Sequence, residues 1–143
     1  MKDKKSIKQL TLEELNALNK DTLMEALGIR YTLVTKERVE AVMEVNASTC
    51  QPIGILHGGA TLALAETAAG MGSYMNCGDD EAPVGMQVNC NHVSSASLGE
   101  QVVAVATPLH LGHSTQVWNI DVSSSSGRLI STIRLTNFIK RID

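Results

Sequence analysis

The segment QPIGILHGGATLALAETAAGMGSY, residues 51–74, decides the fold of this chain. It runs for twenty-four residues with a single charged side chain, that of Glu66. From the HGG motif onward it is rich in alanine and leucine, which predicts one long helix. Because such a helix is apolar nearly all round, we expect it to be buried, and a strongly curved sheet could bury it.

Strand-like segments lie on both sides of this predicted helix. Before it, apolar residues recur at every second position around a polar turn, TKER, residues 35–38, which predicts a β-hairpin. After it come four more segments of strand composition, residues 83–93, 100–110, 114–122 and 128–139, joined by short turn-rich links. Short links favour antiparallel pairing. The sequence therefore predicts an α+β fold in which one curved antiparallel sheet wraps a single long central helix.

Residues 1–28 are expected to form a helical lead-in to a single domain that spans residues 1–143. Thr11 followed by Glu14 predicts a capping box at the start of a short amphipathic helix. Asp21 can cap a second short helix, and Gly28 suits the end of that helix. We interpret the basic cluster at the N-terminus as a solvated leader: Lys2, Lys4, Lys5 and Lys8.

The composition narrows the class of protein. A net charge of −3 and four aromatic residues (one Trp, two Tyr, one Phe) argue against a nucleic-acid partner. The chain has no run of eighteen apolar residues, so we expect no membrane partner, and we expect a cytoplasmic location because we see no secretion signal. The odd number of cysteines, without CxxC spacing, indicates free thiols rather than a disulfide framework: Cys50, Cys77 and Cys90.

The start of the central helix is a candidate anion site. Gly58 and Gly59 follow His57 there, and the first N–H groups of a helix have no partner within the helix. The partial positive charge of a helix N-terminus would stabilise an oxygen that becomes negative in a transition state. The alternative is that the two glycines only allow a tight turn and close packing.

Glu66 is the candidate catalytic residue. It follows Gly59 by seven residues, so both lie on nearly the same helix face, about 10 Å apart. This is too far for both to hold one reacting atom, unless the substrate is extended or a second chain supplies the helix start. Burying an unpaired carboxylate is costly, and desolvation would make Glu66 a better general base. The alternative is a carboxylate that reaches solvent or pairs with an arginine.

Three parts of the chain resemble the hotdog-fold acyl-CoA thioesterases: QPIGILHGGATLALAE at 51–66, VGMQVNCNHV at 84–93, and PLHLGHSTQVWNI at 108–120. The resemblance is closest to the branch that acts on aromatic acyl-CoAs such as 4-hydroxybenzoyl-CoA and 1,4-dihydroxy-2-naphthoyl-CoA. It implies a hotdog fold and hydrolysis of an aromatic or bulky acyl-CoA without a cofactor. It also implies homodimers with sites shared between two chains, paired further into a homotetramer.

The same resemblance assigns roles to four residues. It implies that Glu66 is the nucleophile or the general base, and that the Gly58 backbone N–H polarises the thioester carbonyl. His57 and Gln51 would hold that carbonyl or the attacking water; taken alone, each could equally make an ordinary local contact. One departure is Gly70, because related enzymes often carry a serine or threonine one turn after the glutamate.

Further candidates would contact the substrate. Strand alternation puts His92 on one face with Val84, Met86, Val88 and Cys90, where it is either a core histidine or, by resemblance, a contact of the acyl group. Gly85 and Met86 are expected at the start of that strand; the resemblance implies that they run beside the pantetheine arm, and the alternative is plain sheet. His113 and Ser114 could meet the CoA phosphates.

Several other interpretations of the residues are weaker. His110 and His113 lack a third and fourth ligand, so we expect no metal site. Arg134 is either a phosphate partner or a solvated arginine. Cys90 is a poor nucleophile candidate, because strand neighbours two apart put His92 about 7 Å away. The rival functions are a hotdog enoyl-thioester hydratase or dehydratase, and a non-catalytic acyl-CoA binding module.

Overall fold

The computed structural model describes residues 6–142, so Lys2, Lys4 and Lys5 of the predicted leader lie outside the described residues. The N-terminal part contains η1 (Ile7–Gln9), α1 (Leu12–Ala17), α2 (Leu23–Ala26), β1 (Arg30–Val34) and β2 (Val39–Glu44). The long helix α3 (Gly58–Asn76) is followed by β3 (Glu81–His92), β4 (Gln101–Leu111), β5 (Thr115–Ser124) and β6 (Leu129–Arg141).

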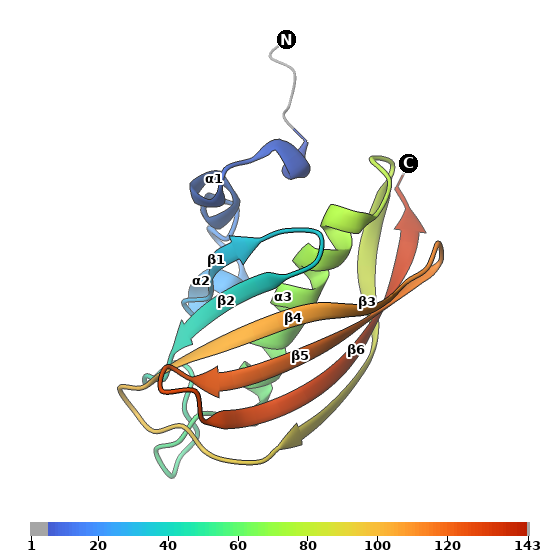
Figure 1. The fold of residues 1–143 in the computed structure, drawn as a ribbon. Helices are drawn as coiled ribbons and strands as arrows, with labels where there is room; N and C mark the ends of the chain where they lie inside the picture. Colours follow the sequence, from blue (N-terminus) through green and yellow to red (C-terminus); the bar gives the residue numbers. More distant parts are fainter. Residues whose placement is uncertain (1–5, 143) are drawn as a thin grey trace.

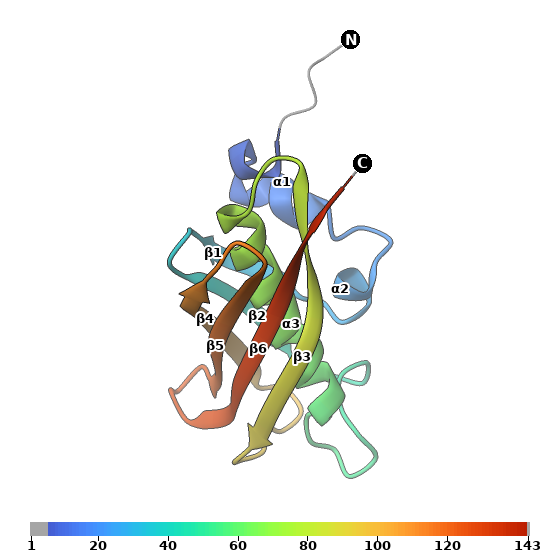
Figure 2. The same cartoon turned by 90° about the vertical axis from the view of Figure 1, so that its right-hand side faces the viewer.

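The strands form one antiparallel sheet in the order β1-β2-β4-β5-β6-β3. The sheet curves around α3, which lies on its concave side, and the N-terminal helices lie beyond β1 (Figure 1, Figure 2). The predicted fold is therefore confirmed. Strands β1 and β3 are the two edges of the sheet, and among the strands of residues 6–142 β3 pairs with β6 alone.

One face of α3 packs closely on the sheet because its residues are small. Ala65, Ala68 and Ala69 are fully buried there. At Gly72 a β-carbon would lie 2.5 Å from the ring of Trp118, so only glycine allows this approach. The Trp118 indole N–H donates to Ser73 Oγ at 2.9 Å, which satisfies the one polar group of the buried ring.

The opposite face of α3 is not covered by the sheet. Glu66 is exposed, while Leu62, Thr67 and Gly70 are half-buried. The expectation of a helix buried all round is therefore wrong for the single chain, and so is the burial of Glu66 that it implied. The apolar residues on this face line a cavity instead of packing against strands.

The N-terminal helices follow the predicted pattern with one correction. The Thr11 side chain accepts a hydrogen bond from the Glu14 backbone N–H, and the Glu14 carboxylate accepts one from the Thr11 N–H, which confirms the capping box. Asp21 does not cap α2; Thr22 precedes that helix, and Asp21 takes a left-handed backbone conformation with φ of 59°. Gly28 has φ of 68°, the conformation that often ends a helix.

We predict that Gly72→Ala destabilises the fold. The added methyl group would collide with the buried Trp118 ring, and overpacking of this kind lowers the free energy of unfolding by about 1–3 kcal/mol. Chemical denaturation measures this change. The matched control is Gly70→Ala on the open face, where a β-carbon meets no atom of the described part of the chain within 4 Å. Helix propensity alone should make that variant equally stable or up to roughly 1 kcal/mol more stable. Equal stability of Gly72→Ala and the wild type would contradict the packing argument.

Candidate active site

The start of α3 presents a free backbone donor. His57 caps the helix, since its Nδ1 accepts a hydrogen bond from the Gly59 N–H at 2.8 Å. The neutral His57 ring therefore carries its proton on Nε2. The N–H of Gly58 makes no hydrogen bond with any of residues 6–142. Of the two glycines in the HGG motif, Gly58 is the one with a donor available to a ligand.

His92 lies directly against this helix start. A β-carbon on Gly58 would be 2.7 Å from His92 Nε2, so the glycine makes room for the imidazole ring. His92 Nδ1 shares a hydrogen bond of 2.8 Å with Ser131 Oγ on β6, which orients the ring. Sequence reasoning missed Ser131; its signal is a serine at an inward position of a strand, next in the inward row to the apolar Ile133 and Leu135. Gly58 and His92 both line a pocket of about 340 Å³.

The predicted face of β3 needs a correction. The register shifts between Gly85 and Gln87, so Met86 is an extra residue that forms a β-bulge. Val84 and Met86 therefore do not share a face with His92; Val84 pairs with Phe138 on the outer side of the sheet. Gly85 pairs with the buried Asn137, and it is Gly85 that faces α3 together with Val88, Cys90 and His92. Gly85 and Met86 also lie within β3 rather than at its start.

Glu66 reaches from α3 toward this glycine. A β-carbon on Gly85 would lie 2.5 Å from Glu66 Oε1, so the absence of a side chain there makes room for the carboxylate. Glu66 is exposed and forms no hydrogen bond or ion pair with any of residues 6–142. It lines a pocket of about 220 Å³ together with Gly85 and Val88. Its carboxylate is available to a ligand or to another chain.

A larger cavity of about 590 Å³ lies on the other side of Glu66. Its floor is the open face of α3, and its roof comes from η1, α1 and α2. Most of its lining is apolar, including Leu15, Leu18, Leu23, Met24, Leu62 and Met71. Burial raises the pKa of the lining residue Tyr31 to about 12, so its hydroxyl keeps its proton. The cavity has room for an apolar group next to the Glu66 carboxylate.

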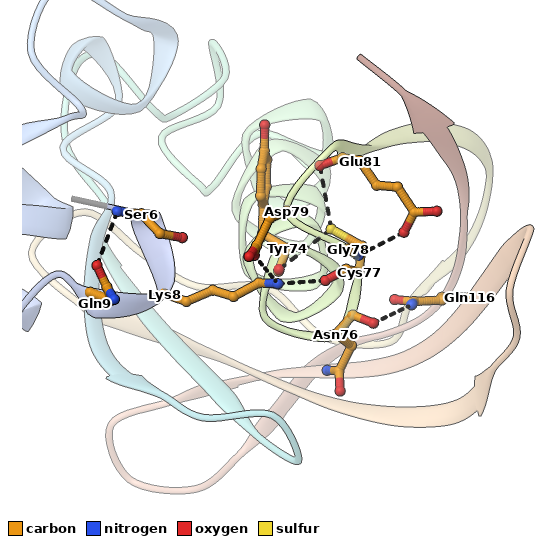
Figure 3. A network of polar contacts seen from close by, with 10 residues as sticks. All are labelled: Ser6, Lys8, Gln9, Tyr74, Asn76, Cys77, Gly78, Asp79, Glu81 and Gln116. Carbon is orange, nitrogen blue, oxygen red and sulfur yellow. Dashed lines mark hydrogen bonds and ion pairs between the residues drawn. The ribbon is translucent and has the colours of Figure 1, made fainter. Parts of the chain in front are cut away.

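Polar contacts anchor η1 over the C-terminal end of α3 (Figure 3). Lys8 Nζ donates to the Cys77 carbonyl oxygen at 2.5 Å and forms an ion pair with Asp79 at 3.0 Å. A cation is favourable at this end of a helix because the last carbonyl groups carry partial negative charge. Ile7, from η1, lines the cavity next to this anchor. Lys8 is therefore a structural contact rather than part of a free leader.

The single chain does not bring all the predicted site residues together. Gly58 and Glu66 are eight residues apart on one helix, which is about 12 Å. His113 and Ser114 lie in the β4–β5 turn, next to Gln116, which contacts Asn76 at the C-terminal end of α3 (Figure 3). That end is about 28 Å from the helix start.

Gln51 Oε1 accepts a hydrogen bond from the Ile53 N–H at 2.9 Å, an ordinary turn contact.

The expected separation of about 7 Å between Cys90 and His92 is wrong. Cys90 is still a poor nucleophile candidate, for a different reason. Cys90 Sγ lies 3.6 Å from His92 Nδ1, because the two side chains lean toward each other along the strand. Burial raises the pKa of the Cys90 thiol, and the hydrogen bond from Ser131 offsets this only in part. A thiol that keeps its proton is a weak nucleophile.

Residues 6–142 contain no group of three or more His, Cys, Asp or Glu side chains that could hold a metal ion. Within the same residues, no helix is both long and apolar enough to cross a membrane.

Arg134 lies on the outer face of the sheet, in register with Asn89 and Asn119, and away from α3.

Comparisons with known proteins identify the family of the chain. Residues 53–131 match the family model of the thioesterase superfamily. The chain is 42% identical to the proofreading thioesterase EntH of Cronobacter turicensis, over 92% of this chain and 96% of that protein. It is 40% identical to the 1,4-dihydroxy-2-naphthoyl-CoA hydrolase of Escherichia coli, with the same coverage. The crystal structure of a thioesterase from Haemophilus influenzae superposes with a TM-score of 0.88, at 36% identity, covering 93% of this chain and 92% of that one.

Fold and relatives together define a thioester hydrolase with a hotdog fold. The chain belongs to the thioesterase superfamily. The resemblance inferred from the sequence is thereby confirmed at the level of family, fold and enzyme class.

We predict that Gly85→Ala lowers kcat for thioester hydrolysis by about 10²-fold while the protein stays folded. The new β-carbon would displace the Glu66 carboxylate, and a shift of about 1 Å in a reacting group can have an effect of this size. The measurement is steady-state release of free thiol. The control is Asn119→Ala, on the outer face of β5 and away from both α3 and the edge of β3, which should keep wild-type kcat. Unchanged kcat in Gly85→Ala would contradict the role of this contact.

Proposed function

We propose that the enzyme hydrolyses an acyl-CoA whose acyl group is aromatic or otherwise bulky and apolar, giving the free acid and CoA. The apolar cavity of about 590 Å³ beside Glu66 supports an acyl group of this kind. The name of one relative, a 1,4-dihydroxy-2-naphthoyl-CoA hydrolase, supports an aromatic acyl-CoA. The name of another, a proofreading thioesterase, supports thioester hydrolysis.

In the proposed mechanism the thioester carbonyl oxygen binds at the start of α3. The free Gly58 N–H donates to this oxygen and stabilises the negative charge that develops on it. Glu66 either removes a proton from the attacking water or attacks the carbonyl carbon itself, forming an anhydride that water then hydrolyses. In both routes the C–S bond breaks, the CoA thiolate takes up a proton, and water supplies the new oxygen of the acid.

The site is proposed to form between two chains, and the path of β3 supports this arrangement. Within one chain, β3 passes Glu66 at Gly85 and reaches Gly58 at His92. The outer edge of β3 pairs with no strand of residues 6–142, and apolar surface is exposed along it by Val84, Met86 and Val88. If two β3 edges pair antiparallel, the Gly85 end of one strand lies beside the His92 end of the other. Glu66 of one chain then faces the helix start of the other.

This arrangement removes the separation of about 12 Å between Gly58 and Glu66. An unpaired edge strand with exposed apolar residues also tends to associate with another strand. Each dimer would hold two equivalent sites, and further pairing into a homotetramer is part of the proposal. His57, Gln51 and His92 would surround the carbonyl and the water at the helix start. Gly85, Met86, His113 and Ser114 are proposed contacts of the CoA arm.

We predict that Glu66→Gln loses turnover by about 10²- to 10⁴-fold, the usual contribution of a general acid or base. Because Glu66 is exposed and unpaired in the single chain, the variant should fold and associate as the wild type does. A panel of acyl-CoAs with detection of free thiol measures the loss, and size-exclusion chromatography checks the assembly. Comparable rates in both proteins would refute the mechanism. Tight acyl-CoA binding without turnover in the wild type would favour a binding module instead.

The role of the Gly58 N–H can be tested by comparing Gly58→Pro with Gly58→Ala. Both substitutions place a β-carbon against His92, but only proline removes the N–H. Proline is tolerated at the first position of a helix, and the extended conformation of His57 is compatible with a following proline. We predict a kcat for Gly58→Pro that is about 10²- to 10³-fold below that of Gly58→Ala. Equal values would exclude the donor role.

The same variant tests whether two chains share a site. Mixing equal amounts of Gly58→Pro and Glu66→Gln under conditions of subunit exchange should restore up to about a quarter of wild-type activity. About half of the dimers are then mixed, and each mixed dimer has one intact site of two. If the sites lay within single chains, mixing would restore nothing.

A further inference from the structure

Ser131 is a buried serine that the proposed mechanism does not use. It lies directly opposite His92 in the pairing of β3 with β6, and the two side chains are in contact. Ser131 is fully buried, whereas His92 lines the pocket of about 340 Å³ at the helix start. Among residues 6–142, Ser131 is not part of that lining. Any effect of Ser131 on the site therefore passes through His92.

The Ser131 hydroxyl has two partners on β3. His92 Nδ1 lies 2.8 Å from Ser131 Oγ, which is the length of a good hydrogen bond. The Cys90 side chain also hydrogen-bonds Ser131. Cys90 Sγ lies 3.6 Å from Nδ1 and 3.7 Å from Nε2 of His92, so the sulfur is in line with neither ring nitrogen. Ser131 is therefore the group that holds Nδ1.

Two acceptors compete for the single proton of the Ser131 hydroxyl. An imidazole nitrogen without a proton is a good acceptor, whereas the sulfur of a thiol is a weak one. Burial raises the pKa of the Cys90 thiol, so Cys90 keeps its proton and remains the weak acceptor. These strengths favour a hydrogen bond from Ser131 to His92 Nδ1. The one proton of the neutral imidazole then lies on Nε2.

The Nε2 end of His92 meets the start of α3. A β-carbon on Gly58 would lie 2.7 Å from Nε2, and the Gly58 N–H is free within residues 6–142. Among the same residues, Nε2 has no nitrogen or oxygen partner; its polar contact is the Cys90 sulfur at 3.7 Å. An N–H at Nε2 and the N–H of Gly58 thus offer two donors to one small pocket, one from the strand and one from the helix.

We infer that Ser131 is a positioning residue: it donates to Nδ1 and so holds His92 with its proton on Nε2, as a second donor to the thioester carbonyl oxygen beside Gly58. This inference rests on the proposed hydrolysis of an acyl-CoA at the helix start. Donors that are fixed in advance stabilise a developing negative charge without having to reorient. Without the hydroxyl the ring is free to turn, and the second donor is lost for part of the time.

The first test is the tautomer of His92 in the wild-type protein, which needs no substrate. The chain has four histidines, so long-range ¹H–¹⁵N correlation NMR can separate their ring nitrogens, and the signals missing from His92→Ala identify His92. We expect the neutral ring to carry its proton on Nε2, with Nδ1 at the chemical shift of a hydrogen-bonded acceptor. In Ser131→Ala, Nδ1 should move to the shift of a free acceptor. A neutral wild-type ring protonated on Nδ1 overturns the inference.

The second test is a double-mutant cycle on the hydrolysis of benzoyl-CoA. Ser131→Ala is expected to lower kcat about 10- to 10²-fold, less than the loss of about 10²- to 10³-fold for a donor that is removed outright. KM should stay within about twofold, because the donor acts on charge that develops in the transition state. In the His92→Ala background the same substitution should have no further effect, because Ser131 acts through the ring.

Thr132→Val is the matched control, since it removes the hydroxyl of the next residue on β6, which donates to Asp121 Oδ1 at 2.9 Å; it should keep wild-type kcat. Unchanged kcat in Ser131→Ala, or an equal loss in the wild-type and His92→Ala backgrounds, overturns the inference while leaving the thioesterase function intact. Wild-type protein that does not hydrolyse benzoyl-CoA, or Glu66→Gln with full activity, overturns the proposed function and the inference with it.

Discussion

The close approach of α3 to the sheet at Trp118 is the constraint on which the rest of the structure depends. Gly72 allows the indole ring to lie against the helix backbone, and the neighbouring alanines extend this tight contact along one face. Because that face packs on the sheet, the residues on the opposite face of α3 point away from the sheet. Glu66 and Gly70 lie there, at the border of the cavity. The buried face of α3 thus decides which residues can meet a substrate.

Two glycines fix how α3 and β3 face each other, and they do so in a reciprocal way. Gly58 on the helix makes room for the imidazole of His92 from the strand, and Gly85 on the strand makes room for the carboxylate of Glu66 from the helix. Each glycine therefore admits a polar side chain from the opposite element. A substitution at either glycine would act on the site through the neighbouring side chain rather than through the backbone alone.

The order of the helices and strands could be predicted from the sequence, because the change from helical to alternating periodicity is strong and the turns are short. It was insufficient where one residue changes the geometry. The bulge at Met86 reverses the faces of β3, and its only sequence signal is Gly85 inside a strand pattern. Composition also cannot distinguish an apolar residue that packs from one that lines a cavity, which is why α3 was expected to be buried all round. The lean of Cys90 toward His92 is likewise set by side-chain rotamers rather than by strand spacing.

The cavity lies between α3 and the N-terminal helices, which pack on the core through Leu15 and Met24 and are also attached by polar contacts at their edges. The Asn16 side chain bonds both backbone groups of Tyr31, and Asn19 bonds the carbonyl of Ile29, so α1 is attached to the start of β1. Lys8 attaches η1 to the far end of α3. Between these contacts Leu18 and Leu23, which line the cavity, remain 52% and 61% exposed. An apolar group that fills the cavity would remove Leu18 and Leu23 from water. The burial of these two side chains would then contribute to the binding free energy of that group.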